Sequence, residues 1–155
     1  MEADPQNPHK NKVHHVLAQS YSVYFVLFLI SIYLDFIFRI GIFDNNTARI
    51  AGVIFIIFGT FLVFWAQKSS RVLDKENISK ETFRKGPYRH TRYPTHWGML
   101  LLLLGFGIVA DALFVVLFTL IAFVISQSVF LKKHDKILTE KYGEHFTEYK
   151  KSVKF

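Results

Sequence analysis

The segment KGPYRHTRYPTHWG, residues 85–98, carries more chemically versatile side chains than any other stretch of the chain. Arg89 and Arg92 are suited to charge-assisted hydrogen bonds with a carboxylate or a phosphate. Aromatic faces stack on flat ligands and hold cations. The segment supplies three such rings, those of Tyr88, Tyr93 and Trp97. A ligand that is both zwitterionic and aromatic needs anion-binding and cation-binding groups of this kind together.

Two prolines shape this segment. Pro87 and Pro94 fix their own φ angles and disfavour helix at the residues before them, Gly86 and Tyr93. We therefore expect a shaped loop that enters a helix near Pro94. The first N–H groups of a helix have no partner within the helix, so this helix start favours an anionic ligand group.

The histidines of the segment do not suggest a metal. His90 and His96 lie six residues apart, and the chain has no cysteine. This pattern matches none of the usual ligand spacings, so no metal site and no disulfide are expected. A simpler interpretation of the loop also stays open, because Arg, Tyr and Trp collect at membrane–water interfaces as anchors.

The elements that must hold this loop are long and apolar. The chain is 51% hydrophobic and 17% aromatic, and a bilayer span needs about 20 mostly apolar residues, with about 17 as the lower limit. Residues 21–40 and 50–66 meet that length, and residues 97–131 are apolar almost throughout. The last run is too long for one span, so we expect a tight helical hairpin there. The sequence predicts an all-α, polytopic membrane helical bundle with four transmembrane helices.

One membrane domain over residues 1–155 is expected. Its predicted parts are a polar N-terminal tail at 1–15, two spans within 16–67, a loop with the 85–98 segment at 68–96, the hairpin at 97–131 and a C-terminal amphipathic helix at 132–155. The tail carries acids and prolines, which is not typical of a signal peptide. In the last part, apolar residues recur at helical spacing between Lys and Glu, and Gly143 is a point at which that helix could break.

The positive charge is one-sided in this arrangement. Lys and Arg concentrate in the N-terminal tail, in residues 68–92 and from Lys132 onward, and the formal net charge is +7. The positive-inside rule then predicts an integral, multi-pass membrane protein whose two termini and 68–96 loop are cytoplasmic. Because the basic residues flank spans, membrane lipids with anionic headgroups explain the charge and nucleic acid does not.

Two local features also carry predictions. Asp35 and Arg39 are four apart with the acid first, which favours an ion pair on one helix face. The stretch GIFDNNTAR is typical of a turn, and Asn46 or Thr47 is expected to cap the helix that follows.

The loop and the tail together resemble a known enzyme family. The sequence GPYRHTRYPTHWG resembles the signature Gly-Pro-Tyr-Arg-x-x-Arg-His-Pro-x-Tyr-x-Gly of membrane methyltransferases related to isoprenylcysteine carboxyl methyltransferase and the phospholipid N-methyltransferases. The tail LTEKYGEHFTEYKKSV resembles that family's closing Phe-Gly-x-x-Tyr-x-x-Tyr-x-x-x-Val helix. The resemblance covers residues 78–153, with both motifs in the family's order and a hairpin between them.

What the resemblance implies is an enzyme that uses S-adenosylmethionine. The family's cofactor contacts would fall here on Thr82, Phe83, Tyr88, Tyr93, Pro94, His96 and Asp135. The chain departs from the family at three points. Tyr93 stands where the family has histidine, and His96 stands where it has tyrosine. His134 and Asp135 stand where the family has an acidic pair.

The predicted function is methyl transfer from S-adenosylmethionine to a lipophilic acceptor that reaches the site from the bilayer. A carboxylate acceptor needs no base, whereas a protonated amine does, and His96 is the nearest candidate base. Arg89 or Arg92 would instead orient an anionic acceptor. The sequence leaves open a prenylated cysteine carboxylate, an ethanolamine phospholipid or a small thiol or amine. The alternative is a non-catalytic membrane protein on the same scaffold that binds lipid or a protein partner.

Overall fold

Every regular element that the structure describes is helical. The computed structural model describes residues 8–42, 45–70 and 86–153. The long helices are α1 (Pro8–Phe38), α2 (Asn46–Ser70), α3 (Pro94–Val109), α4 (Leu113–Ile125) and α5 (Leu131–Ser152). A 3-10 turn, η2 (Gly86–Arg89), precedes α3, and a π-helical turn, η3 (Ser126–Phe130), joins α4 to α5. The predicted all-α fold is confirmed.

Three of the described helical segments are long and apolar enough to cross a membrane. They are His15–Phe38, Asn46–Ser69 and Leu113–Glu140. Helix α3 is equally apolar but has only 16 residues, which is about 24 Å at 1.5 Å per residue and falls short of the roughly 30 Å hydrocarbon core. The chain is therefore an all-α membrane bundle, and a fourth span through α3 stays a proposal.

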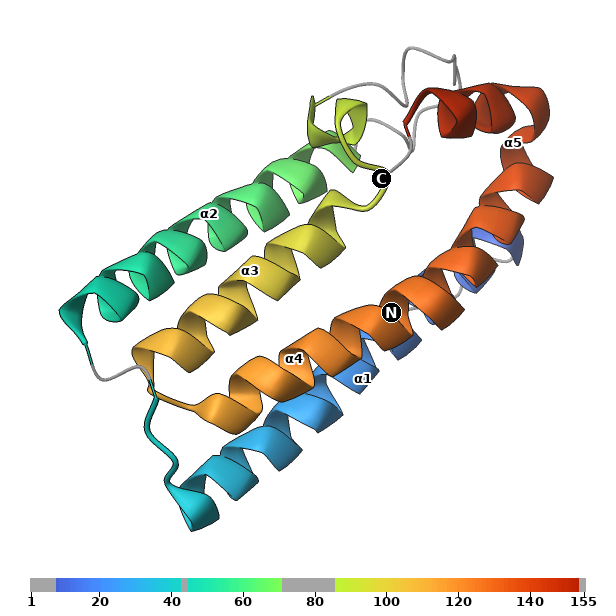
Figure 1. The fold of residues 1–155 in the computed structure, drawn as a ribbon. Coiled ribbons are helices and arrows are strands. Elements are labelled where there is room, and N and C mark those ends of the chain that lie inside the picture. The colour runs from blue at the N-terminus through green and yellow to red at the C-terminus, as the bar shows by residue number, and fades with distance from the viewer. Residues whose placement is uncertain (1–7, 43–44, 71–85, 154–155) are drawn as a thin grey trace.

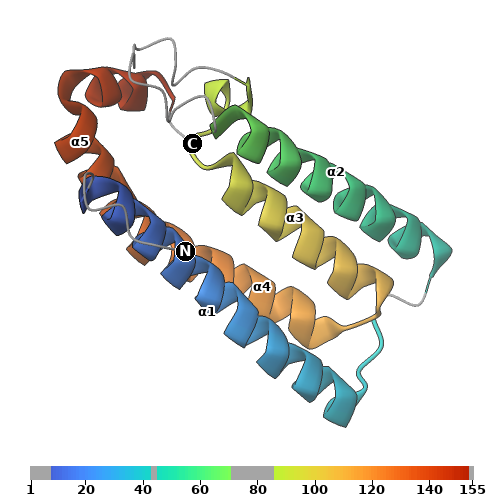
Figure 2. The same ribbon diagram turned by 180° about the vertical axis from the view of Figure 1, so that it is seen from behind.

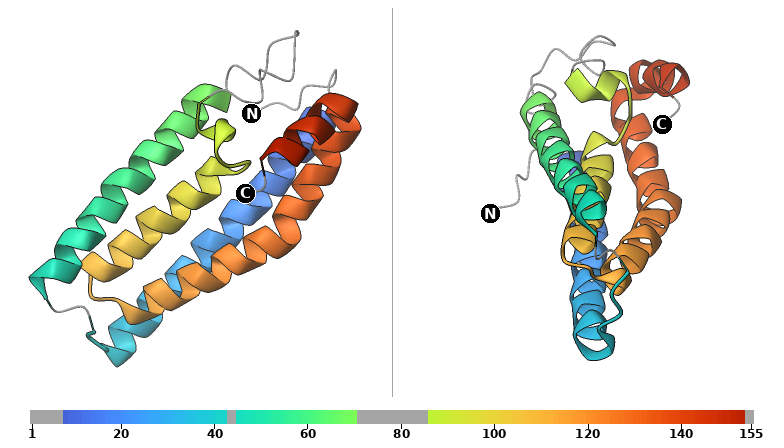
Figure 3. Two further views of the ribbon diagram at one scale, coloured as in Figure 1. Left: turned by 45° about the horizontal axis from the view of Figure 1, so that its top comes forward. Right: turned by 60° about the vertical axis from the view of Figure 1, so that its left-hand side comes forward.

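The helices pack as two pairs that meet along α3 and α4 (Figures 1 and 2). Helix α1 packs against α4, and α2 packs against α3. The connection from α1 to α2 and the turn from α3 to α4 lie at one end of the bundle. The start of α1, the end of α2, the turn η2 and helix α5 lie at the other end, where the last turns of α5 fold back over the bundle (Figure 3). At this second end, residues 86–98 lie close to the C-terminal segment.

Helices α2 and α3 meet backbone to backbone at paired glycines. A Cβ atom built on Gly105 would lie 2.5 Å from the Gly52 carbonyl oxygen, and one on Gly59 would lie 2.7 Å from the Gly98 oxygen. Within each helix these glycines are seven residues apart, so they fall on one face. Small residues let two membrane helices approach this closely, which increases their van der Waals contact.

We expect Gly105→Ala to destabilise the bundle by about 1–3 kcal/mol, because the added methyl group overfills a closed backbone contact. Thermal unfolding of the purified protein in detergent measures the change. Ala110→Leu is the control, since Ala110 is exposed just past the end of the same helix. Equal melting temperatures for the Gly105→Ala variant and the native protein would contradict this packing.

Asp35 ties α1 to α4. Its two carboxylate oxygens accept hydrogen bonds from the backbone N–H groups of Phe114 (3.0 Å) and Val115 (2.9 Å), in the first turn of α4. The ion pair predicted between Asp35 and Arg39 is wrong. The Arg39 guanidinium lies 5.6 Å from the centre of the Phe36 ring instead. Because first-turn N–H groups carry partial positive charge, an acid supplied by a neighbouring helix caps α4 from outside its own sequence.

We expect Asp35→Asn and Arg39→Gln to differ in their effects. Loss of the charged cap should cost about 0.5–2 kcal/mol of stability, whereas loss of the Arg39 charge should leave the melting temperature nearly unchanged. Thermal unfolding of both variants in the same detergent measures the difference. Equal losses of stability in the two variants would support an Asp35–Arg39 ion pair and contradict the role of Asp35 as the cap of α4.

The cap of α2 lies one residue earlier than predicted. The side-chain oxygen of Asn45 accepts a hydrogen bond from the Ala48 N–H at 2.6 Å. Helix α2 begins at Asn46, so Asn46 and Thr47 already lie inside the helix and the prediction that one of them caps it is wrong.

The amphipathic C-terminal helix is present and is broken once. Gly143 has φ 56° and ψ −127°, a conformation that ends one helical segment and starts another. After this break the chain returns over the bundle (Figure 1). Phe146, Tyr149 and Val153 are buried there as one cluster, against which Leu138 packs. The returning half of α5 is therefore held to the first half by an apolar core.

Candidate functional site

The turn η2 packs against the end of α2. Gly86 has φ 61°, and a Cβ atom there would collide with the side chain of Ser69. Only glycine fits such a position without strain. Pro94 is buried at the start of α3, where its missing N–H costs the helix nothing. Gly86 and Pro94 thus fix the start and the end of the loop between them.

Asp135, in the first half of α5, is the centre of the loop's contacts. One carboxylate oxygen, Oδ2, lies 2.9 Å from Arg92 Nη1 and 2.8 Å from Lys150 Nζ. The other, Oδ1, accepts a hydrogen bond from the hydroxyl of Tyr93. The Arg92 and Asp135 side chains are only 18% and 13% exposed, so water screens this pair less than it would a surface pair. The structure thus brings together three of the residues that the sequence analysis selected.

The Tyr93 hydroxyl is a permanent donor in this arrangement. Burial, together with the hydrogen bond to Asp135, raises the pKa of Tyr93 well above its usual value. The hydroxyl also lies 3.3 Å from the carbonyl oxygen of Leu131. Tyrosine at this position therefore binds the start of α5 through a group that keeps its proton at physiological pH.

The returning half of α5 contacts the loop through a second tyrosine, Tyr149. The Tyr149 hydroxyl donates a hydrogen bond to the backbone carbonyl of Tyr88 at 2.7 Å. Burial raises the pKa of Tyr149, so this hydroxyl also stays protonated. The loop is thus held from both halves of α5, at Tyr88 by the second half and at Tyr93 by the first.

His96 faces the interior of the bundle. It is 1% exposed, and its Nε2 lies 3.1 Å from the Ser20 hydroxyl of α1. Ser20 in turn lies 2.7 Å from the Ser126 hydroxyl, at the start of the π-helical turn η3. A buried polar chain therefore joins α1, α3 and η3. Sequence reasoning missed Ser20 and Ser126, although a hydroxyl inside an apolar span is itself a signal of an interhelical hydrogen bond.

A second imidazole flanks Tyr93. The ring centres of Tyr93 and His134 are 5.6 Å apart, and those of Tyr93 and His96 are 6.1 Å apart. Within the described part of the chain, Nδ1 of His134 is buried and has no hydrogen-bond partner. Buried polar atoms are nearly always satisfied, so Nδ1 of His134 is an exception next to the loop. In the sequence, His134 stands out only as a departure from the family's acidic pair.

The remaining predicted residues lie apart from this cluster. Arg89 is exposed at the end of η2, and the Trp97 ring packs 5.0 Å from that of Phe123 in α4. Thr82 and Phe83 lie outside the described residues. In the ranges that the structure describes, no group of three or more metal-binding side chains occurs.

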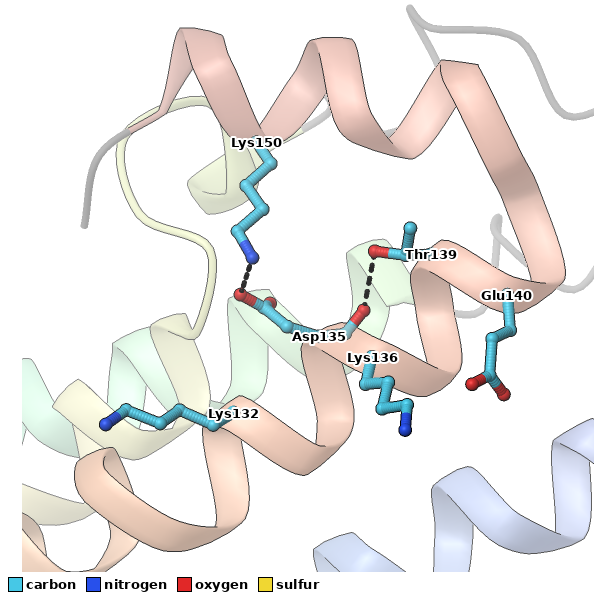
Figure 4. Close-up of a pocket in the computed structure, with 6 residues that line it drawn as sticks. All are labelled: Lys132, Asp135, Lys136, Thr139, Glu140 and Lys150. Atoms are coloured by element: carbon cyan, nitrogen blue, oxygen red, sulfur yellow. Dashed lines mark hydrogen bonds and ion pairs between the residues drawn. The ribbon is translucent and has the colours of Figure 1, made fainter.

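A groove of about 440 Å³ lies beside Asp135 (Figure 4). Its lining residues are Lys132, Asp135, Lys136, Thr139, Glu140 and Lys150. Lys150 reaches down from the returning half of α5 onto Asp135, which comes from the first half (Figure 4). Asp135 therefore separates the groove from the aromatic cluster around Tyr93.

The comparisons with known proteins identify the family. A family model described as phospholipid methyltransferase matches residues 47–145, from the first turn of α2 to just past the break in α5. Neither the curated proteins nor the solved structures give a significant match. The matched range contains the loop, both imidazoles and Asp135, and it covers well over half of the chain. The chain belongs to the phospholipid methyltransferase family.

Proposed function

We propose that this protein transfers a methyl group from S-adenosylmethionine to the headgroup amine of a membrane phospholipid. The observation that carries the proposal is the contact of Arg92 and Tyr93 with Asp135, which joins the signature loop to the position of the family's acidic pair, beside two imidazoles. This cluster lies at the end of the bundle where the apolar run of α4 gives way to charged residues. A lipid headgroup would meet the protein at the same depth.

The side chains of the cluster suit the methyl donor. S-adenosylmethionine, when bound, supplies an electrophilic methyl group on a sulfonium cation. The rings of Tyr88 and Tyr93 offer faces that hold a cation without attacking it. The unpartnered Nδ1 of His134 offers a hydrogen bond to a ligand that is buried beside it. Asp135 fixes the hydroxyl of Tyr93, so the ring is held in place before any ligand binds.

His96 is our candidate for the general base. A headgroup ammonium must lose a proton to become nucleophilic, and a neutral imidazole can accept a proton at its unprotonated ring nitrogen. When Ser20 donates its proton to Ser126, its oxygen accepts the Nε2–H of His96, which leaves Nδ1 of that ring free to accept a proton. The Ser20 and Ser126 hydroxyls would thus select the Nε2–H tautomer of His96, whose Nδ1 can act as a base.

The returning half of α5 is expected to exclude water. Its contacts to the loop through Tyr149 and to Asp135 through Lys150 cover the cluster on one side. In-line displacement needs little covalent help from the protein, so held geometry and a dry site provide most of the catalysis. The basic residues of the N-terminal tail, the 68–96 loop and α5 place this end of the bundle on the cytoplasmic side in our proposal.

A non-catalytic lipid-binding protein is the second candidate. The observation that favours it is the carboxylate of Asp135, which already receives Arg92, Lys150 and Tyr93. A carboxylate engaged in this way is a poor ligand for the hydroxyls of a nucleoside. In this alternative the same cluster would serve only to hold the loop on α5.

A methyl-transfer assay separates the two functions. The purified protein in nanodiscs would receive donor labelled in its methyl group, and the label in the lipid fraction would be counted. Discs of phosphatidylethanolamine should gain label, and discs of phosphatidylglycerol, which lack an amine, should not. Label on an added prenylated cysteine instead would reassign the acceptor to a carboxylate. Bound donor without transfer to any acceptor would favour the non-catalytic protein.

A further inference from the structure

The polar chain at His96 lies well inside the apolar length of the bundle. Nε2 of His96 lies 3.1 Å from the Ser20 hydroxyl, which lies 2.7 Å from that of Ser126, so the three side chains share one level. Lys132 is the first charged residue after Ser126 and follows it by six helical residues. At 1.5 Å per residue, Lys132 lies about 9 Å further along the bundle than this level.

Helix α2 gives the same depth independently. Gly59 meets Gly98 backbone to backbone, and α2 and α3 run in opposite directions (Figure 1). Lys68, the first charged residue after Gly59, lies nine residues beyond it, whereas His96 lies two residues from Gly98 toward the same end. The difference of seven residues is about 10 Å. Two helices therefore place their first lysine about 9–10 Å beyond His96.

The opposite end of the bundle gives a third measure. Asp111 lies in the turn between α3 and α4, and no charged residue lies between Asp111 and Lys132. Their separation along α4 is about 30 Å, which matches the thickness of a hydrocarbon core. His96 is only 15 residues from Asp111, about 22 Å along α3. A core that starts at Asp111 therefore extends about 8 Å past His96.

A titratable side chain at this depth is a sign of function. His96 is 1% exposed, and ionisable residues inside the hydrocarbon core are costly, rare and usually found on paths of substrates or protons. Asp135 differs in depth, because it follows Lys132 by three residues and so lies at the level of the headgroups. The proposed site thus extends from the headgroup level at Asp135 into the hydrocarbon core at His96.

We propose that methyl transfer takes place below the plane of the headgroups and that its rate depends on the thickness of the bilayer. The dependence of the rate rests on the proposed function, whereas the depth of His96 does not. A headgroup amine that gives its proton to His96 must descend about 8–10 Å past the level of Lys68 and Lys132. A thinner hydrocarbon core brings the headgroups closer to His96, and a thicker one moves them away. The protein is therefore suited to a thin membrane.

Fluorescence quenching measures the depth without any methyl donor. The chain has two tryptophans, Trp65 and Trp97. Trp97 directly follows His96, whereas Trp65 lies six residues beyond Gly59, so its backbone is about 8 Å closer to the headgroups. The variants Trp65→Phe and Trp97→Phe each leave one of the two rings. In phosphatidylcholine vesicles, a nitroxide near the middle of the acyl chain should quench Trp97 more than a nitroxide near the headgroup, and the order should reverse for Trp65.

Acyl chains of different length test the dependence on thickness. Nanodiscs of phosphatidylcholine with short or long monounsaturated chains would contain the same fraction of phosphatidylethanolamine with matching chains. Label transfer from the donor should be about tenfold faster in the short-chain discs, because a mismatch of several ångströms adds to the barrier. Dihexanoyl phosphatidylethanolamine is the control acceptor. It is not anchored in the leaflet, so its methylation should be equal in both discs. Melting temperatures in both discs show that the protein is folded.

Three results would overturn the proposal. Quenching of Trp97 mainly by the shallow nitroxide would place His96 at the headgroup level. Equal rates in short-chain and long-chain discs would show that depth does not limit the reaction. An equal change of rate for both acceptors would assign the effect to the protein and not to access of the lipid.

The two measurements keep this inference apart from the proposed function. Methylation of both acceptors without any effect of thickness would leave the proposed function standing and remove the inference. Deep quenching of Trp97 without label on any acceptor would remove methyl transfer, and with it the dependence of the rate, and leave the depth of His96 standing.

Discussion

Replacing His96 with glutamine is expected to slow methylation of a phospholipid amine by about 100-fold or more, the range that general bases contribute. Glutamine can still hydrogen-bond to Ser20, so the polar chain between α1 and α3 is kept while the proton acceptor is lost. Donor binding should change little. The rate of label transfer in phosphatidylethanolamine nanodiscs measures the first effect, and calorimetry with the donor measures the second.

His90→Gln is the matched control for this prediction. His90 belongs to the same loop but is exposed, so its loss should leave the rate nearly unchanged. Ser20→Ala should slow transfer by a smaller factor, because it removes the partner of His96 Nε2 and not the imidazole itself. Near-native rates in His96→Gln would assign His96 a purely structural role and direct attention to His134.

Replacing Asp135 with asparagine is expected to weaken donor binding by about 10- to 100-fold, the equivalent of the charged hydrogen bonds that are lost. Asp135 holds Tyr93 on one oxygen and Arg92 on the other, so its charge positions the end of the loop that enters α3 against α5. Without that charge, the partly buried Arg92 guanidinium loses this ionic contact and the loop can shift. Equilibrium dialysis with labelled S-adenosylmethionine measures the affinity.

Glu144→Gln serves as control for the charge change, because Glu144 is exposed beyond the break in α5. It should bind the donor like the native protein. Tyr93→Phe should reproduce part of the Asp135→Asn effect, since it removes one of the same hydrogen bonds. Unchanged donor affinity in both Asp135→Asn and Tyr93→Phe would show that the donor binds elsewhere on the protein.

The bundle could be predicted because its signals are local. Apolar runs of spanning length and a loop bounded by Pro87 and Pro94 follow from residue types within a short window. The resemblance to the family also predicted that Tyr93 and Asp135 contribute to one site. Each of these inferences depends on residues that are close in sequence or on a sequence motif.

The partners of individual side chains could not be predicted, because they come from distant parts of the chain. Asp35 caps a helix that begins 78 residues later, at Leu113, so its neighbour Arg39 was the natural but wrong choice. Ser20 meets Ser126 only once α1 has packed on η3. A hydroxyl in an apolar run predicts that a partner exists, and only the fold decides which one it is.

The decisive experiment is a calorimetric titration of the native protein in nanodiscs with S-adenosylmethionine and its demethylated product. We expect saturable binding of both at one site, weakened strongly by Tyr93→Ala and by Asp135→Asn, and unaffected by Glu144→Gln. No binding of either compound to folded, lipid-embedded protein would contradict the account and leave a non-catalytic member of the family.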